Sequence, residues 1–289
     1  MEIVIQDLSV KYMKDTPFEK QALSQIHLRI PKGSFVAVVG ATGSGKSTLI
    51  QCIAGLIRPC AGHVRVGDQI FDANSKSGAA LRRHVGMVFQ YPEHQLFADT
   101  VKSDIAFGLK NRGIKEPEVS RRVRWAMDLV GLSPELSERS PFRLSGGQMR
   151  RVAIAGILAL KPDIFILDEP SAGLDAKGEQ ELFRLLKEIH EKQKKTVILV
   201  THDMDQAVRY ADRIFVLACG KLVLSGTPEE VFGHDQKWQR ELSLDLPQVT
   251  QLIAKLNQRL DPPLPLSIFT LDALEKALVK RFPSGEDLA

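Results

Sequence analysis

The stretch from Gly40 to Thr48 constrains the fold of this chain more than any other feature. It reads Gly-Ala-Thr-Gly-Ser-Gly-Lys-Ser-Thr and lies between an apolar segment, Phe35–Val39, and a segment with helical character, Leu49–Leu56. Glycines let a backbone turn tightly enough for several N–H groups to face one anion, and the N-terminus of a following helix adds positive potential. We therefore predict a strand, a phosphate-binding loop and a helix in that order, which is a building block of α/β folds.

Two side chains of this loop have chemistry suited to a nucleoside triphosphate. Lys46 supplies a mobile cation for the β- and γ-phosphates, and Ser47 places a hydroxyl where it can ligate Mg²⁺. The alternative is a glycine-rich surface turn, which the flanking strand and helix disfavour. The residues predicted to bind the triphosphate are Gly40, Ala41, Thr42, Gly43, Ser44, Gly45, Lys46, Ser47 and Thr48.

Apolar runs outside the loop predict a sheet that is buried on both faces. Ile164–Leu167 and Thr196–Val200 are almost continuously apolar, and an amphipathic helix lies between them. This alternation is typical of a parallel sheet covered by helices. From Tyr91 to Leu160 helical signals dominate, which predicts a helical insertion. Further strands are expected at Ile3–Ile5, Ile26–Ile30, Gly62–Val66, Gln69–Phe71, Val85–Phe89, Ile214–Leu217 and Leu222–Leu224.

Two acidic residues, Asp168 and Glu169, follow the strand Ile164–Leu167. On its own such a pair could simply face solvent. Beside a phosphate loop, the first acid is placed to hold Mg²⁺ and the second to polarise a water molecule for in-line attack on the γ-phosphate. We therefore predict Asp168 as a metal ligand and Glu169 as the general base.

A second motif, Leu144–Gln148, reads Leu-Ser-Gly-Gly-Gln and opens a helical run, Met149–Leu160. Its backbone N–H groups and one hydroxyl form another anion-binding set at a helix N-terminus. Alone, it would be no more than a helix cap. Beside Gly40–Thr48, it gives one chain two separate phosphate cradles.

Together these motifs resemble those of the ATP-binding cassette (ABC) family. In that family two cassettes pack head to tail, and each ATP lies between the phosphate loop of one subunit and the signature stretch of the other. The resemblance spans roughly residues 2–233 and implies an ATPase that uses ATP and Mg²⁺. The implied signature residues, which would contact the ATP of the partner, are Leu144, Ser145, Gly146, Gly147 and Gln148.

Four more positions match family motifs. Gln90 matches the sensor glutamine of the family. The resemblance implies a role for it in catalysis and, with Ser47 and Asp168, in the Mg²⁺ site. His202 matches the switch histidine that contacts the γ-phosphate. Tyr12 lies where the family stacks an aromatic ring on adenine; an ordinary aromatic at a strand end is the alternative. Asp175 closes a stretch, from Ser171, that matches the loop crossing the dimer interface in the family.

The sequence departs from the family at two positions. Ser171 stands where the family often has Thr, and Ala176 where it often has Pro. Neither change removes a phosphate or metal ligand, so the resemblance still implies hydrolysis.

The resemblance implies an α/β fold with a P-loop NTPase (RecA-like) core. To this core are added an N-terminal antiparallel β subdomain, a helical signature subdomain at about 91–160 and a small C-terminal helical appendage. We expect the ABC ATPase domain to span residues 1–240. Residues 241–289 would form a dimerisation appendage, with helices at Pro247–Leu260 and after Thr270.

The segment after Gln90 indicates the type of cassette. Tyr91–Phe97, Thr100–Val101 and Asp104–Gly108 are similar to the ATPases of energy-coupling factor transporters, and most like the second of their two ATPase subunits. These importers carry vitamins or other micronutrients. The implied partners are a second ABC ATPase subunit, a paralogue in a heterodimer or a second copy, and two membrane subunits, one for coupling and one for the substrate. The implied place is the cytoplasmic face of the cell membrane; the substrate is not encoded here.

Composition excludes several other classes. The net charge of +4 gives no argument for nucleic acid, and no apolar stretch approaches the roughly 20 residues of a membrane span. The N-terminus lacks an export signal, and three cysteines without metal spacing indicate reduced thiols. Another type of ABC transporter remains an alternative. A soluble ABC ATPase that acts on ribosomes or DNA is disfavoured, because the chain has a single cassette and no coiled coil. An inactive regulatory half is disfavoured by the intact Glu169 and His202.

Overall fold

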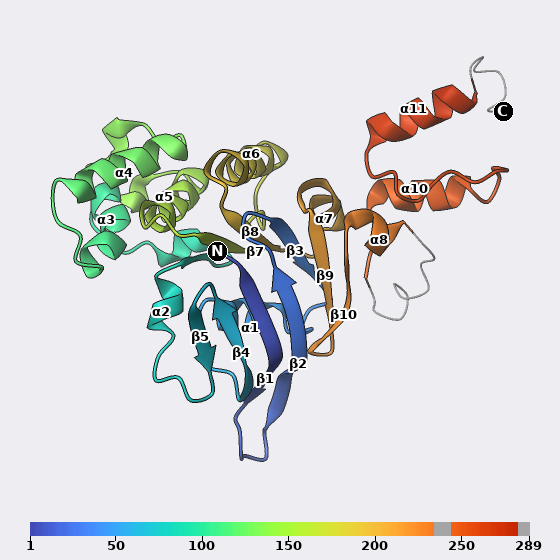
Figure 1. Ribbon diagram of the computed structural model, residues 1–289. Helices are drawn as coiled ribbons and strands as arrows, with labels where there is room; N and C mark the ends of the chain where they lie inside the picture. The colour runs from blue at the N-terminus through green and yellow to red at the C-terminus, as the bar shows by residue number, and fades with distance from the viewer. Residues whose placement is uncertain (234–243, 283–289) are drawn as a thin grey trace.

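The computed structural model describes residues 1–233 and 244–282 and is built around two sheets (Figure 1). The larger sheet has six strands in the order β10-β9-β3-β8-β7-β6, parallel from β9 to β6, with β10 antiparallel at one edge. Its strands are β3 (Phe35–Val39), β6 (Val85–Val88), β7 (Ile164–Asp168), β8 (Thr196–Val200), β9 (Arg213–Ala218) and β10 (Lys221–Gly226). The predicted parallel sheet is present, and its carboxyl edge is where the predicted site residues gather.

The smaller sheet is antiparallel, with the order β2-β1-β4-β5. Its strands are β1 (Ile3–Tyr12), β2 (Lys20–Ile30), β4 (Ala61–Val66) and β5 (Gln69–Asp72). Both β1 and β2 are longer than predicted. Their pairing is interrupted by register shifts, and Asp7 and Gln25 have positive φ. These irregularities break the alternation that reveals a strand in a sequence.

The buried side chains of β3 alternate between two hydrophobic clusters. Val36 and Val38 face the antiparallel sheet and the helix α1 (Lys46–Ile53). Phe35, Ala37 and Val39 face the opposite cluster. The helices α5 (Gly146–Ala159), α6 (Ala176–Gln193) and α7 (Met204–Tyr210) contribute to this cluster. The larger sheet therefore forms the middle of three layers, as expected for a sheet covered on both faces.

The predicted helical insertion is present and forms one side of the molecule (Figure 1). The short turns within it are η1 (Pro92–Gln95), η2 (Pro134–Leu136) and η3 (Pro141–Arg143), and its helices are α3 (Val101–Asn111), α4 (Glu118–Leu129) and α5 (Gly146–Ala159). The other helices of the core are α2 (Ala79–Arg82), α6 (Ala176–Gln193), α7 (Met204–Tyr210) and α8 (Pro228–Phe232).

Two C-terminal helices, α10 (Gln248–Leu256) and α11 (Leu271–Arg281), lie at the opposite side of the view from the insertion (Figure 1). The first ends at Leu256, earlier than predicted. The two helices share a small apolar cluster of their own, formed around Val249, Ile253, Leu264 and Leu274. The predicted domain boundary between residues 240 and 241 lies outside the described residues. Within the described ranges, no helix has both the length and the apolar character needed to cross a membrane.

Candidate active site

The phosphate loop joins β3 to α1, as predicted. Gly40 has φ 154°, and a Cβ there would lie 2.2 Å from the carbonyl oxygen of Leu217, so only glycine fits. The Nζ of Lys46 donates to the carbonyl oxygens of Gly40 and Ala41, at 2.8 and 3.0 Å. Burial lowers the pKa of Lys46, against the opposing charges of Glu169 and Asp168. The buried ammonium group is thus held inside the loop, where a phosphate could replace its carbonyl partners.

The side chain of Ser44 provides a test of whether this loop fits an anion. Its Oγ is buried and has no hydrogen-bond partner among the described residues. Buried polar atoms are nearly always paired, so an orphaned hydroxyl indicates an absent ligand. The loop therefore fits a triphosphate, which would supply acceptor oxygens for this hydroxyl.

The predicted metal ligands Ser47 and Asp168 lie together. Asp168 ends β7 and is half-buried, and it forms a hydrogen bond with the side chain of Ser47. Burial raises the pKa of Asp168; the hydrogen bond from Ser47 opposes this shift, and the charge of Glu169 adds to it. A hydroxyl and a carboxylate are both oxygen donors of the kind that Mg²⁺ prefers, so this pair fits the ion.

Glu169 is the centre of a second group of predicted residues. Its Oε2 accepts from Nε2 of Gln90 at 3.2 Å, and its Oε1 lies 3.2 Å from Nδ1 of His202. Glu169 itself has φ 47°, and its N–H donates to the carbonyl of Val200 at 2.9 Å. These three side chains follow β6, β7 and β8, neighbouring parallel strands, so their carboxyl ends meet at one edge of the sheet.

Tyr12 also lies at the phosphate loop. Its hydroxyl is 3.0 Å from Oγ1 of Thr48, and the side chain remains 40% exposed. The ring is therefore available to a base whose phosphates occupy the loop, while its hydroxyl is anchored to α1.

The signature residues are not joined to this site. Ser145 caps α5: its Oγ accepts from the N–H of Gln148, whose side chain accepts in return from the N–H of Ser145. No hydrogen bond in the described part of the chain links them to Gly40–Thr48. Both Gly146 and Gly147 are exposed, and a Cβ at either would meet no atom within 4 Å. Packing inside this chain thus gives no reason for these glycines.

Asp175 has a local structural role. It caps α6, with its Oδ1 accepting from the N–H of Gly178 at 2.8 Å, and its side chain is exposed. Like the signature, it lies away from the phosphate loop of its own chain.

Sequence reasoning missed two buried polar side chains next to the site. Arg150, on α5, binds Glu93 and the turn that follows Glu169. Gln206, on α7, donates from Nε2 to the side chains of Ser171 and Glu179 and accepts from Thr201 Oγ1, next to His202. Except for Thr201, the partners of these residues lie 20 or more residues away in sequence, so no spacing pattern signals them.

The chain is similar to several known proteins. The model of the family described as ABC transporter matches residues 23–172. The chain is 44% identical, over 99% of its length and 98% of the relative's, to the "Energy-coupling factor transporter ATP-binding protein EcfA2" of Bacillus thuringiensis (strain Al Hakam). The protein of the same name from Caldanaerobacter subterraneus subsp. tengcongensis is 46% identical, with 97% of each chain covered.

Two solved structures share the fold. One is cbiO1 of Clostridium perfringens, described as part of the ABC transporter complex cbiONQ; it has a TM-score of 0.73 and 36% identity, covering 87% of this chain and 98% of that one. The other is the ATP-binding cassette MJ0796, a dimer in a post-hydrolysis state bound to ADP and Pi. Its TM-score is 0.69 at 30% identity, covering 78% of this chain and 98% of the other. The fold is thus that of a known group of proteins.

Proposed function

The chain belongs to the ABC transporter family and is an ATPase, and from this premise we propose that it powers an energy-coupling factor importer. ATP would be hydrolysed to drive uptake of vitamins or other micronutrients through membrane partners. The importer assignment is carried by the similarity to the EcfA2 proteins. Its hydrolytic part is carried by the convergence of Gln90 and His202 on Glu169 beside Lys46 and Asp168.

The site residues would divide the work on the triphosphate as follows. Lys46 and the backbone of the loop hold the phosphates, and Tyr12 lies against the base. Ser47, Asp168 and Gln90 would hold Mg²⁺, which, when bound, neutralises charge on the β- and γ-phosphates. Glu169 accepts the proton of the attacking water, and its two contacts, to Gln90 and His202, orient its carboxylate. His202 is exposed and would donate to the γ-phosphate.

The signature residues would complete the ATP site of a second subunit. Ser145, Gly146 and Gly147 are exposed at the N-terminus of α5, where N–H groups and the positive end of the helix favour a phosphate. Glycines unneeded by their own chain suit a surface that another molecule approaches closely. We propose a head-to-tail pair, with a paralogue as the second ATPase subunit and with Asp175 at the interface.

An exposed aromatic pair offers a docking surface for the membrane coupling subunit. Phe97 and Phe107 are 58% and 47% exposed, and their rings meet edge to face at 4.7 Å. Asp104 fixes the loop below them by accepting from the N–H groups of Phe97 and Ala98. The segment follows Gln90 directly in the chain, so a structural change at the ATP site would be transmitted to a docked coupling subunit. A substrate-binding membrane subunit would complete the complex, with this chain at the cytoplasmic face of the cell membrane.

Two substitutions test the proposal. Lys46→Ala should abolish ATP hydrolysis by the purified transporter complex, because it removes the buried cation from the phosphate loop. Glu169→Gln should still bind ATP but retain it, giving a closed ATPase pair that gel filtration detects. Lys221→Ala, at the exposed start of β10, serves as the control. Turnover at the control rate in Lys46→Ala would contradict the proposal, and the absence of a stabilised pair in Glu169→Gln would contradict the role of Glu169.

A further inference from the structure

Arg150 is a buried cation outside the phosphate loop. Of the charged side chains that the structure describes, only those of Lys46 and Arg150 are buried, and Arg150 is 5% exposed. Its guanidinium group binds Glu93 through two bonds, from Nε at 3.0 Å and from Nη2 at 2.8 Å. This is the bidentate geometry that gives an Arg–carboxylate pair its strength and its fixed orientation. The pair is thus a rigid joint and not a mobile surface contact.

The same guanidinium group also binds the turn that follows Glu169. Nη1 donates to the carbonyl oxygen of Pro170 at 3.1 Å, and Nη2 donates to that of Ala172 at 3.0 Å. These carbonyls lie on either side of Ser171, immediately after the predicted general base. A change in the position of Arg150 would therefore move the backbone that sets the direction of the Glu169 carboxylate.

The three segments joined at Arg150 all carry predicted functions. Arg150 lies two residues after Gln148 on the signature helix α5, and Glu93 lies in η1, three residues after Gln90. The third segment is the turn after Glu169. One side chain therefore connects the signature, the sensor segment and the general base.

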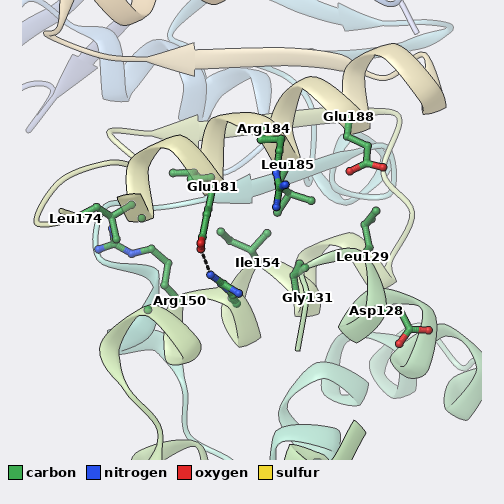
Figure 2. Close-up of a pocket in the computed structure, with 15 residues that line it drawn as sticks. Asp128, Leu129, Gly131, Arg150, Ile154, Leu174, Glu181, Arg184, Leu185 and Glu188 are labelled. Carbon is green, nitrogen blue, oxygen red and sulfur yellow. Dashed lines mark hydrogen bonds and ion pairs between the residues drawn. The ribbon is translucent and has the colours of Figure 1, made fainter. Parts of the chain in front are cut away.

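A cavity beside Arg150 lies between α5 and α6. It has a volume of about 400 Å³, and Gly147, Ile154, Leu174 and Leu185 are among the residues that line it. Figure 2 shows Arg150 and Leu174 at one end of the cavity, with Glu181 reaching across from α6. Glu181 pairs with Arg151, whose side chain is 37% exposed. This partly exposed pair contributes little, whereas the pair of Arg150 with Glu93 is buried.

We propose that Arg150 is a positioning residue for hydrolysis. It holds the Glu169 carboxylate in its productive direction only while α5 and η1 are both bound to the turn that follows Glu169. The inference rests on the proposed function, since α5 begins at the signature that would contact the partner's ATP. Arg150 thereby connects Glu169, which acts on the ATP of this subunit, to the signature helix, which would contact the ATP of the partner. Removing one partner of a buried ion pair is costly, so the loss of either Arg150 or Glu93 should disrupt the joint.

The test uses the assembled transporter complex with Arg150→Met, Arg150→Lys and Glu93→Gln, and measures hydrolysis over a range of ATP concentrations. We expect kcat to fall about 10²-fold in Arg150→Met and Glu93→Gln, as when a reacting group is misplaced by about 1 Å. KM for ATP should change less than about threefold, because the phosphate loop is untouched. Arg150→Lys should recover only part of the rate, because an ammonium group cannot reproduce the two-pronged geometry.

Arg122→Met is the matched control, because Arg122 pairs with Glu118 inside the single helix α4. It should leave kcat and KM at their wild-type values. If Arg150→Met does not assemble, Glu93→Gln decides, since it removes the charge with little change of shape. A kcat within about threefold of wild type in an assembled variant, or a parallel change of kcat and KM, would overturn the inference. Lys46→Ala separates the two proposals: if it is inactive while Arg150→Met is fully active, only the role of Arg150 fails.

Discussion

At the residue scale, the two departures from the family pattern have simple physical readings. The Ser171 hydroxyl accepts a hydrogen bond from Nε2 of Gln206 at 3.0 Å, and a threonine would offer the same hydroxyl. Ala176 is the first residue of α6, after the cap Asp175. Proline is favoured at that position because its N–H is not needed, and alanine is favoured because it forms helices well. Both departures keep the local structure.

A buried thiol gives a residue-scale prediction that depends on pH. Cys52 lies on α1 with no exposed surface, and burial raises its pKa from 9.0 to about 12. The thiolate is the reactive form, so at pH 8.5 the thiolate fraction of Cys52 is lower than that of an ordinary thiol by roughly three orders of magnitude. We expect alkylation of the native protein at that pH to spare Cys52 and to modify the exposed Cys219, as read by peptide mass spectrometry.

The sign of the accompanying stability effect follows from the same shift. The raised pKa stabilises the folded state fully below pH 9, and this contribution is lost as the pH rises through about 12. In denaturant, Cys52 should react as fast as Cys219. Rapid labelling of Cys52 in the folded protein would show that α1 is not packed as described.

At the scale of elements, regular patterns were predictable and irregular ones were not. β3, β7 and β8 were found because their apolar runs are uninterrupted. The helix α7 was missed because it has only seven residues and begins with a polar turn around Asp203. Most residues of the candidate site belong to local motifs that a sequence displays directly. The exceptions are Arg150 and Gln206, whose partners lie 57 and 35 residues away, a pairing that only the fold creates.

The C-terminal helices give a prediction at the element scale. Ile253 on α10 is fully buried, and its neighbours belong to the small cluster of Val249, Leu264 and Leu274. Ile253→Ala should destabilise this unit by about 2–5 kcal/mol, because it removes buried methyl groups and leaves a cavity. Hydrogen exchange of amides in α10 and α11 should accelerate while those of β3 and β8 keep their protection. Equal acceleration in the sheet would show that the unit is not separate.

At the scale of the whole molecule, the three layers leave the C-terminal helices attached to one side. The N–H of Gln248 donates to Oδ1 of Asp205 at 3.0 Å, which ties α10 to α7. The outer surfaces of these helices carry exposed apolar residues; Leu271 is 65% exposed and Val279 is 62% exposed. Such surfaces on a short two-helix unit suit contact with another subunit.

Removal of residues 247–289 is therefore expected to weaken association of the ATPase pair. The phosphate loop lies in the central layers, so nucleotide binding by the truncated chain should persist. Analytical ultracentrifugation over a dilution series measures the first effect, and titration with a fluorescent ATP analogue measures the second. An unchanged dissociation constant of the pair would show that these helices have another role.

The empty space around Gly146 and Gly147 has a practical consequence for engineering and for variant surveys. Because a methyl group at either position meets nothing in its own subunit, alanine would be tolerated there and could even strengthen α5 by up to about 1 kcal/mol. A screen that ranks variants by the melting of the lone subunit would grade both changes as harmless or beneficial. Their harm would surface only in the assembled complex, as a loss of ATP hydrolysis and of transport.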